Sequence, residues 1–306
     1  MAAIQRWDLN AGVLQTWLNR KTLENFEPNL QFYKMGTKPL YQQGYDTIAW
    51  AKFSQLNVTP ATATLTDGVT PSDTAFNASV ITTTPTQYGI VVNLSDMVIK
   101  NNVIDFISGS ATEVGMNMAR IVDEVIQTEV MAGTNVRYAD GVANRAGIGA
   151  SNVFEADEIN KAQTQLKNQN APAFEGNMYV AIAHPNVIFD LRADTAAGSW
   201  LEANKYVTND KIFKGEVGSL NGVRFVESTN VKTFASTVTV YPTLFLGRGA
   251  YGISECQTLQ TYITPKVASD SDPLAQRQKI GAKIAFSAKR LQEDAMVRVE
   301  SATSFA

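Results

Sequence analysis

The clearest helical pattern of apolar and polar residues lies between residues 105 and 132. Apolar side chains return there at steps of four and three, which places them on one face of a helix. The positions are Ile107, Ala111, Val114, Met118, Ile121 and Val125. Val122 and Ile126 widen this stripe beyond a strict coiled-coil seam, and Gly133 provides a stop. We expect a helix of about 28 residues, roughly 40 Å long, as the backbone of the fold.

A strict alternation follows near the C-terminus, in residues 279–289. Ile280, Ile284 and Phe286 lie on one side of the predicted strand, while lysines occupy the other. Such a strand belongs to a sheet with one covered face, and the long helix is its obvious cover. Residues 297–300 alternate in the same way and predict a last strand.

A polar, threonine-rich stretch separates two further strand patterns. Residues 53–99 contain neither Lys nor Arg, and ten of the 29 threonines lie in residues 59–86. The flanking segments Thr47–Phe53 and Gln87–Leu94 are rich in β-prone residues. We predict one long two-stranded arm whose tip, residues 60–77, is rich in turn residues. The alternative is a disordered linker.

The middle of the chain alternates between helix and strand patterns. Helical spacing extends over residues 155–168 and follows Pro185 up to residue 192. Strands are predicted at residues 178–183, 223–227 and 238–246. This order predicts a mixed α/β domain.

Composition narrows the classes of function. The 306 residues are 44% hydrophobic and carry a formal net charge of −3, so a sizeable core is expected and strong nucleic-acid binding is not. Cys256 is the only cysteine, which excludes a disulfide within the chain. No signal peptide or apolar run of membrane-spanning length occurs. We expect a soluble protein of the cytoplasm, with no membrane partner.

Candidate catalytic residues are few. His184 is the only histidine, and no nucleophile motif surrounds it or Cys256. Residues 247–252 match the dinucleotide-binding spacing G-x-G-x-x-G, but a strand pattern follows where the motif requires a helix. The acidic residues show no metal-ligand spacing and are interpreted as solvated; they are Asp123, Glu124, Glu129, Asp270 and Asp272. We expect no cofactor and no metal, and keep an unrecognised hydrolase as the enzyme alternative.

Short stretches distributed in order along the chain resemble one known family. They are residues 65–71, 87–89, 95–96, 184–185 with 190–192, 215–218 with 222–227, 272–277 and 295–298. Together they resemble the major capsid proteins of tailed bacteriophages, in particular a podovirus-type family with the Hong Kong 97-type fold.

The resemblance implies an α+β fold divided into five segments. Residues 1–46 would be an N-terminal arm and residues 47–95 an extended β-hairpin, the E-loop. Residues 96–140 would hold the long spine helix of a peripheral domain, whose β-sheet continues in residues 256–306. Residues 141–255 would form a mixed α/β axial domain. The predicted core is Ile107, Val114, Met118, Ile121 and Val125 on the helix with Ile280, Ile284 and Phe286 on the sheet.

The resemblance also implies self-assembly into hexamers and pentamers of an icosahedral shell that encloses double-stranded DNA, built in the host cytoplasm. The predicted contacts between subunits are Leu65, Asp67, Val69, Phe76 and Tyr88. Expected partners are further copies, a portal, a separate scaffolding protein and, in some shells, a decoration protein. The chain begins directly with its arm, which favours the separate scaffold. No lysine lies between Lys52 and Lys100, so we expect a shell without isopeptide cross-links at the loop tip. A nanocompartment shell of the same fold remains the alternative.

Overall fold

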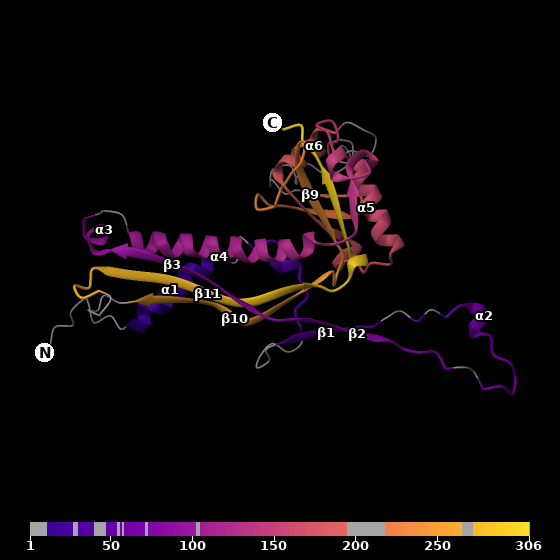
Figure 1. Cartoon of the computed structure of the whole chain (residues 1–306), viewed down its shortest axis with the longest axis horizontal. Coiled ribbons are helices and arrows are strands. Elements are labelled where there is room, and N and C mark those ends of the chain that lie inside the picture. The colour runs from indigo at the N-terminus through magenta and orange to yellow at the C-terminus, as the bar shows by residue number, and fades with distance from the viewer. Residues whose placement is uncertain are drawn as a thin grey trace.

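The computed structural model describes residues 11–26, 30–39, 47–53, 56, 58–70, 73–101, 105–194, 218–264 and 272–305. A long layer of helix and sheet forms the base of the molecule (Figure 1). An upright α/β unit stands at one end of this layer, and a thin two-stranded ribbon extends past the same end.

The predicted long helix is confirmed as α4, Phe106–Met131. Asp105 caps its N-terminus, because the Asp105 carboxylate accepts hydrogen bonds from the backbone N–H groups of Ile107 and Ser108 at 3.1 and 3.2 Å. Val114 and Met118 are buried as expected. Ile107, Ile121 and Val125 are only partly buried, packed against the edge of the core. The most deeply covered face is therefore rotated toward Val122, Ile126 and Val130.

The helix lies along an antiparallel three-stranded sheet, which we call the spine sheet (Figure 1). Its strand order is β10 (Tyr251–Thr264), β11 (Arg277–Arg290) and β3 (Thr86–Ser95). Ile280, Ile284 and Phe286 of β11 are buried, which confirms the predicted sheet core.

Two helices flank α4 that the sequence pattern did not predict. The first, α1 (Ala11–Phe26), packs against α4 and β10, and its Leu18 is buried with Ala111 and Ile280. The approach is close because Gly115 of α4 has no side chain; a Cβ there would lie 2.6 Å from the carbonyl oxygen of Thr22. The second, α3 (Asp96–Asn101), follows β3.

The ribbon pairs different strands from those expected. β1 (Ile48–Phe53) pairs antiparallel with β2 (Ala78–Thr83), whereas β3 pairs with β11 in the spine sheet. The prediction that residues 87–94 form the second strand of the arm is therefore wrong. Their alternating side chains, which include Tyr88, Ile90 and Val92, have the core under α4 as partner, and burial decides the pairing.

The upright unit is the predicted mixed α/β domain. It contains a seven-stranded sheet. The strands are β4 (Val136–Tyr138), β12 (Met296–Ser301), β9 (Thr239–Leu246), β5 (Tyr179–Ala183), β7 (Val223–Glu227), β6 (Ser219–Leu220) and, paired only with β9, β8 (Phe234–Ala235). Helices α5 (Ala156–Asn168) and α6 (Pro185–Ala193) confirm the two predicted there.

The chain crosses between the two sheets more often than the segment boundaries suggest. β12 lies between β4 and β9 in the upright sheet, not in the spine sheet with β11. Its Glu300 is fully buried and forms a bidentate pair with Arg145 at 2.6 Å, joined by Arg298 at 2.8 Å. The boundary expected between residues 255 and 256 falls inside β10, a single strand.

Candidate intersubunit surfaces

The tip of the ribbon exposes apolar side chains. Leu65 is 71% exposed, Val69 63% and Phe76 60%. Asp67 is exposed too, beside Gly68, whose φ of +76° suits the turn closed by the Val69 N–H and the Thr66 carbonyl at 3.1 Å. Burial of apolar side chains of this size against a partner lowers the free energy of the complex.

The tip has local order despite its exposure. The short helix α2 (Pro60–Ala63) begins at a reciprocal capping box between Thr59 and Thr62. The rings of Phe53 and Phe76 stack with centroids 5.3 Å apart, which ties the two sides of the tip together. The tip therefore presents its apolar side chains from a partly preformed surface.

The base of the ribbon is anchored to its own subunit. Ile48 and Trp50 of β1 are buried, whereas residues further along both strands are mostly exposed. The Trp50 ring lies over Gly252 of β10, where a Cβ would come within 2.7 Å of it. The ribbon is thus fixed at one end and extends freely at the other (Figure 1).

Tyr88 differs from the other four predicted contact residues. It is half-buried on β3, and its ring lies 5.1 Å from that of Phe286 in the same chain. The apolar character of Tyr88 is therefore explained by packing within its own subunit. The tip residues Leu65, Asp67, Val69 and Phe76 are the ones that remain free for a neighbour.

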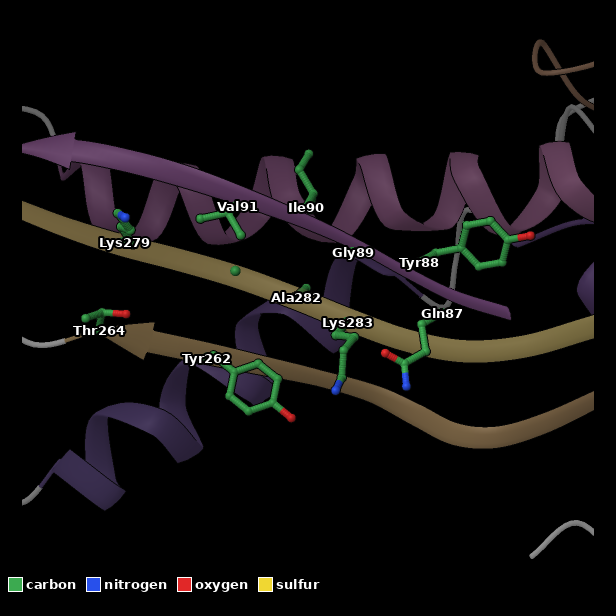
Figure 2. A pocket seen from close by; sticks show the side chains of 11 residues that line it. Gln87, Tyr88, Gly89, Ile90, Val91, Tyr262, Thr264, Lys279, Ala282 and Lys283 are labelled. Atoms are coloured by element: carbon green, nitrogen blue, oxygen red, sulfur yellow. The ribbon is translucent and has the colours of Figure 1, made fainter. Parts of the chain in front are cut away.

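A second candidate surface lies on the spine sheet. A hollow of about 570 Å³, which we call the sheet groove, lies on the face turned away from α4. Figure 2 shows the side chains that line it. Its walls are Gln87, Val91, Tyr262, Thr264, Lys279 and Lys283. Its floor contains Gly89 and Gly281, which have no side chains to fill it. Cross-strand pairing holds the set in register, since Gly281 pairs with Val91 on one side and Tyr262 on the other.

The groove combines cationic and apolar character. Val91 is 68% exposed and Tyr262 49%. The Lys283 ammonium lies 5.9 Å from the centre of the Tyr262 ring. Among the described residues no carboxylate lies within ion-pair distance of Lys279 or Lys283. The third lysine of β11, Lys289, instead pairs with Glu129 of α4 at 3.2 Å.

The expectation that Asp123 is solvated is wrong. It is 1% exposed on α4, and its carboxylate accepts hydrogen bonds from the backbone N–H groups of Gln31 at 2.8 Å and Tyr33 at 3.4 Å. Burial raises the pKa of Asp123 to about 6, partly opposed by backbone hydrogen bonds and by the charge of Lys34. The carboxylate holds the N-terminal segment on the helix.

The remaining catalytic candidates, His184 and residues 247–252, have roles in the fold of the subunit. His184 caps α6 by accepting the Asn186 N–H at its Nδ1, 3.2 Å away, and burial lowers the pKa of His184. Residues 247–252 lead into β10, not into a helix. No group of three or more His, Cys, Asp or Glu among the described residues is arranged to hold a metal ion. No helix in the described ranges is long and apolar enough to cross a membrane.

Comparison with known proteins gives a consistent result. A family model described as phage capsid protein matches residues 78–299. The capsid of Ralstonia phage GP4 superposes with a TM-score of 0.70 and 16% identity over 88% of this chain and 87% of that chain. The capsid of the cyanophage P-SCSP1u superposes with a TM-score of 0.67 and 14% identity, over 90% of this chain and 89% of that chain. The capsid of the cyanophage Pam1 superposes with a TM-score of 0.65 and 14% identity, over 92% of this chain and 93% of that chain. No curated protein sequence matches the chain.

Proposed function

This chain belongs to the phage capsid protein family, and from that premise we propose that its copies form the hexamers and pentamers of an icosahedral shell around the double-stranded DNA of a tailed bacteriophage. It is a structural protein of the capsid, not an enzyme. Its α+β fold is the Hong Kong 97-type arrangement expected from the sequence.

The observation that supports assembly through the arm is the contrast between its base and its tip. The base is anchored by Trp50, while the tip exposes Leu65, Val69 and Phe76. A two-stranded ribbon is marginally stable alone and gains stability by packing on further surface. A tip that extends beyond its own subunit and contacts the next one produces a head-to-tail contact, which closes into a ring when the rotation between neighbours is a whole fraction of a turn.

The segment names follow from this proposal with three adjusted boundaries. Residues 1–46 would be the N-terminal arm, and residues 47–85 with their ribbon the extended loop. The peripheral domain would hold α4 and the spine sheet. The axial domain, facing the capsomer axis, would hold residues 141–250 together with β12, because that strand completes the upright sheet.

The function of such a shell also suggests which other proteins bind it. A container that is filled with DNA needs an entrance, hence a portal. A scaffolding protein would direct curvature during assembly in the host cytoplasm, and a decoration protein would bind the finished surface. Lysine is absent between Lys52 and Lys100, so we propose a shell held together without covalent links at the loop tip.

The test is to remove the tip and look for shells. Phe53 and Ala78 are directly paired across the ribbon, so an Asn-Gly turn can join them without a change of register. We expect the shortened subunit to keep near-wild-type circular dichroism, because the tip adds little to its core. Electron microscopy of the expressed variant should show no closed shells.

A control separates the contacts of the tip from its length. A Leu65→Ser, Val69→Ser, Phe76→Ser variant keeps the full length of the tip but removes the apolar side chains that are exposed in the subunit. It should also fail to assemble while remaining soluble. Normal shells from the shortened variant would refute assembly through the arm, and an insoluble shortened subunit would show that the ribbon belongs to the core.

A further inference from the structure

Among the described residues, no segment of the same subunit fills the sheet groove. The ribbon leaves the spine sheet at Thr86, where β3 begins, and extends away from the stretch of β10, β11 and β3 that forms the groove (Figure 1). The described tip therefore lies beyond the opposite end of the sheet from Lys279. The described part of the subunit thus offers no segment for this groove, which directs attention to a second molecule.

Charge distinguishes the candidates for that segment. Residues 54–95 contain Asp67 and Asp73 and not a single Lys or Arg. Both aspartates are exposed. The groove contributes Lys279 and Lys283, without a carboxylate partner among the described residues. An acidic tip and a basic hollow on the same chain are complementary between two copies.

Apolar surface points to the same occupant. Val91 and Tyr262 stand exposed in the walls, and the tip exposes Leu65, Val69 and Phe76. The missing side chains at Gly89 and Gly281 leave depth for an inserted apolar group. A phosphate backbone makes polar and charged contacts and gains nothing from exposed apolar walls, so nucleic acid fits the hollow less well.

We propose that the sheet groove is the receptor for the arm tip of a second copy, with Lys279 and Lys283 facing Asp67 and Asp73 across the contact. This inference rests on the proposed function, since it requires an arm that reaches a neighbour. The lysine charges select the acidic tip, while Val91 and Tyr262 supply burial. Opposite charges across such a contact fix register more than they add affinity.

Charge exchange tests the pairing. A Lys279→Glu, Lys283→Glu variant places like charges against the tip, and so does an Asp67→Lys, Asp73→Lys variant. Each should raise the concentration needed for assembly by about tenfold or more, which corresponds to roughly 1.4 kcal/mol per contact. The variant with all four changes restores opposite charges and should assemble close to wild type. Asp67, Asp73 and Lys279 are exposed and Lys283 is partly exposed, so circular dichroism should remain unchanged.

Two results would overturn the inference. One is normal assembly of the Lys279→Glu, Lys283→Glu variant. The other is a folded fourfold variant that assembles no better than either pair of changes alone. If the groove variant assembles normally but the shortened arm does not, the arm exchange stands and only the receptor is wrong. If the shortened arm assembles normally, assembly through the arm fails and the inference with it, whereas a wild-type chain that forms no shells would overturn the proposed function.

A cross-link identifies the occupant directly. A photoreactive amino acid in place of Val91, in shells mixed from isotopically labelled and unlabelled subunits, should capture a peptide from residues 54–77 of another copy. Capture of DNA, or of a peptide from any other region, would contradict the inference. The same substitution at Phe189, exposed on α6 of the upright unit, is the matched control and should not capture the tip.

Discussion

At the scale of single residues, Asp123 shows how a charged group can be buried to hold a chain segment. Its carboxylate binds backbone N–H groups only, so it fixes residues 31–33 whatever their side chains. Tyr251 adds a hydrogen bond from its hydroxyl to the carbonyl oxygen of Phe32. The segment after α1 is thereby secured from both sides, by α4 and by β10.

The raised pKa of Asp123 gives this contact a pH dependence. The pKa rises from 3.8 to about 6 on folding, so the folded subunit binds the proton more tightly than the unfolded chain. Stability is then highest below the unfolded pKa and falls as the pH rises from about 4 to 6. A shift of this size corresponds to roughly 3 kcal/mol.

We expect Asp123→Asn to remove this dependence. Urea unfolding of the unassembled subunit at pH 4.5 and pH 7, with the wild type measured alongside, isolates the effect because Glu255 and the other carboxyl groups titrate in both proteins. The wild type should lose more stability between the two values than the variant does. An equal loss in both proteins would show that Asp123 is not the group responsible.

At the scale of elements, the depth of burial along α4 predicts how much each position matters. Val122 is fully buried, whereas its neighbour Ile121 is only partly covered. Val122→Asp places an unpaired charge in the core and should cost several kcal/mol, since a buried side chain of this size contributes about 1.5–3 and the charge adds to the loss. Ile121→Asp can turn its carboxylate toward water and should cost less. Urea midpoints of the two variants that agree within error would contradict the assigned face.

The elements that the sequence predicted are those with a strong, sustained period. α4 and β11 bury one face along most of their length, so their apolar residues recur regularly. β2 is exposed on nearly every residue, and a strand without a buried face leaves no alternation to read. For this reason the sequence predicts β3 as the partner of β1, whereas the structure pairs β1 with β2. In α1 the apolar residues lie on more than one side of the helix, since Leu18 is buried while Trp17 and Leu23 are exposed, so no single stripe stands out.

The two candidate surfaces also differ in how far the sequence predicts them. The tip could be found from the sequence because Leu65, Val69 and Phe76 are isolated apolar residues in a polar, turn-rich stretch. The groove could not, since Gly89 and Gly281 become its floor only when β3 and β11 pair in one register. Asp123 was misjudged for a related reason: its cover comes from residues 31–33, about ninety positions away along the chain.

At the scale of the whole molecule, the base and the upright unit share one continuous hydrophobic core and are joined through long elements. α4 runs the length of the base and ends at the upright unit (Figure 1). There Gln127 accepts a hydrogen bond from the backbone N–H of Lys232 at 3.1 Å. β11 leads directly to β12, so the last strand of the chain closes the upright sheet. Such continuity favours a wall subunit that transmits load between its contacts without a flexible linker.

The charge of the whole molecule predicts how this wall meets the genome. With 26 basic and 29 acidic residues, the subunit has no excess of cations to displace counterions from DNA. The two lysines without a described ion pair in the sheet groove would face a neighbouring arm tip after assembly. We expect fluorescence anisotropy with double-stranded DNA to show no micromolar binding by the unassembled subunit at physiological salt. Lys279→Glu with Lys283→Glu should leave that result unchanged. Binding that weakens steeply as salt rises would instead mean that a cationic surface of the subunit holds the genome.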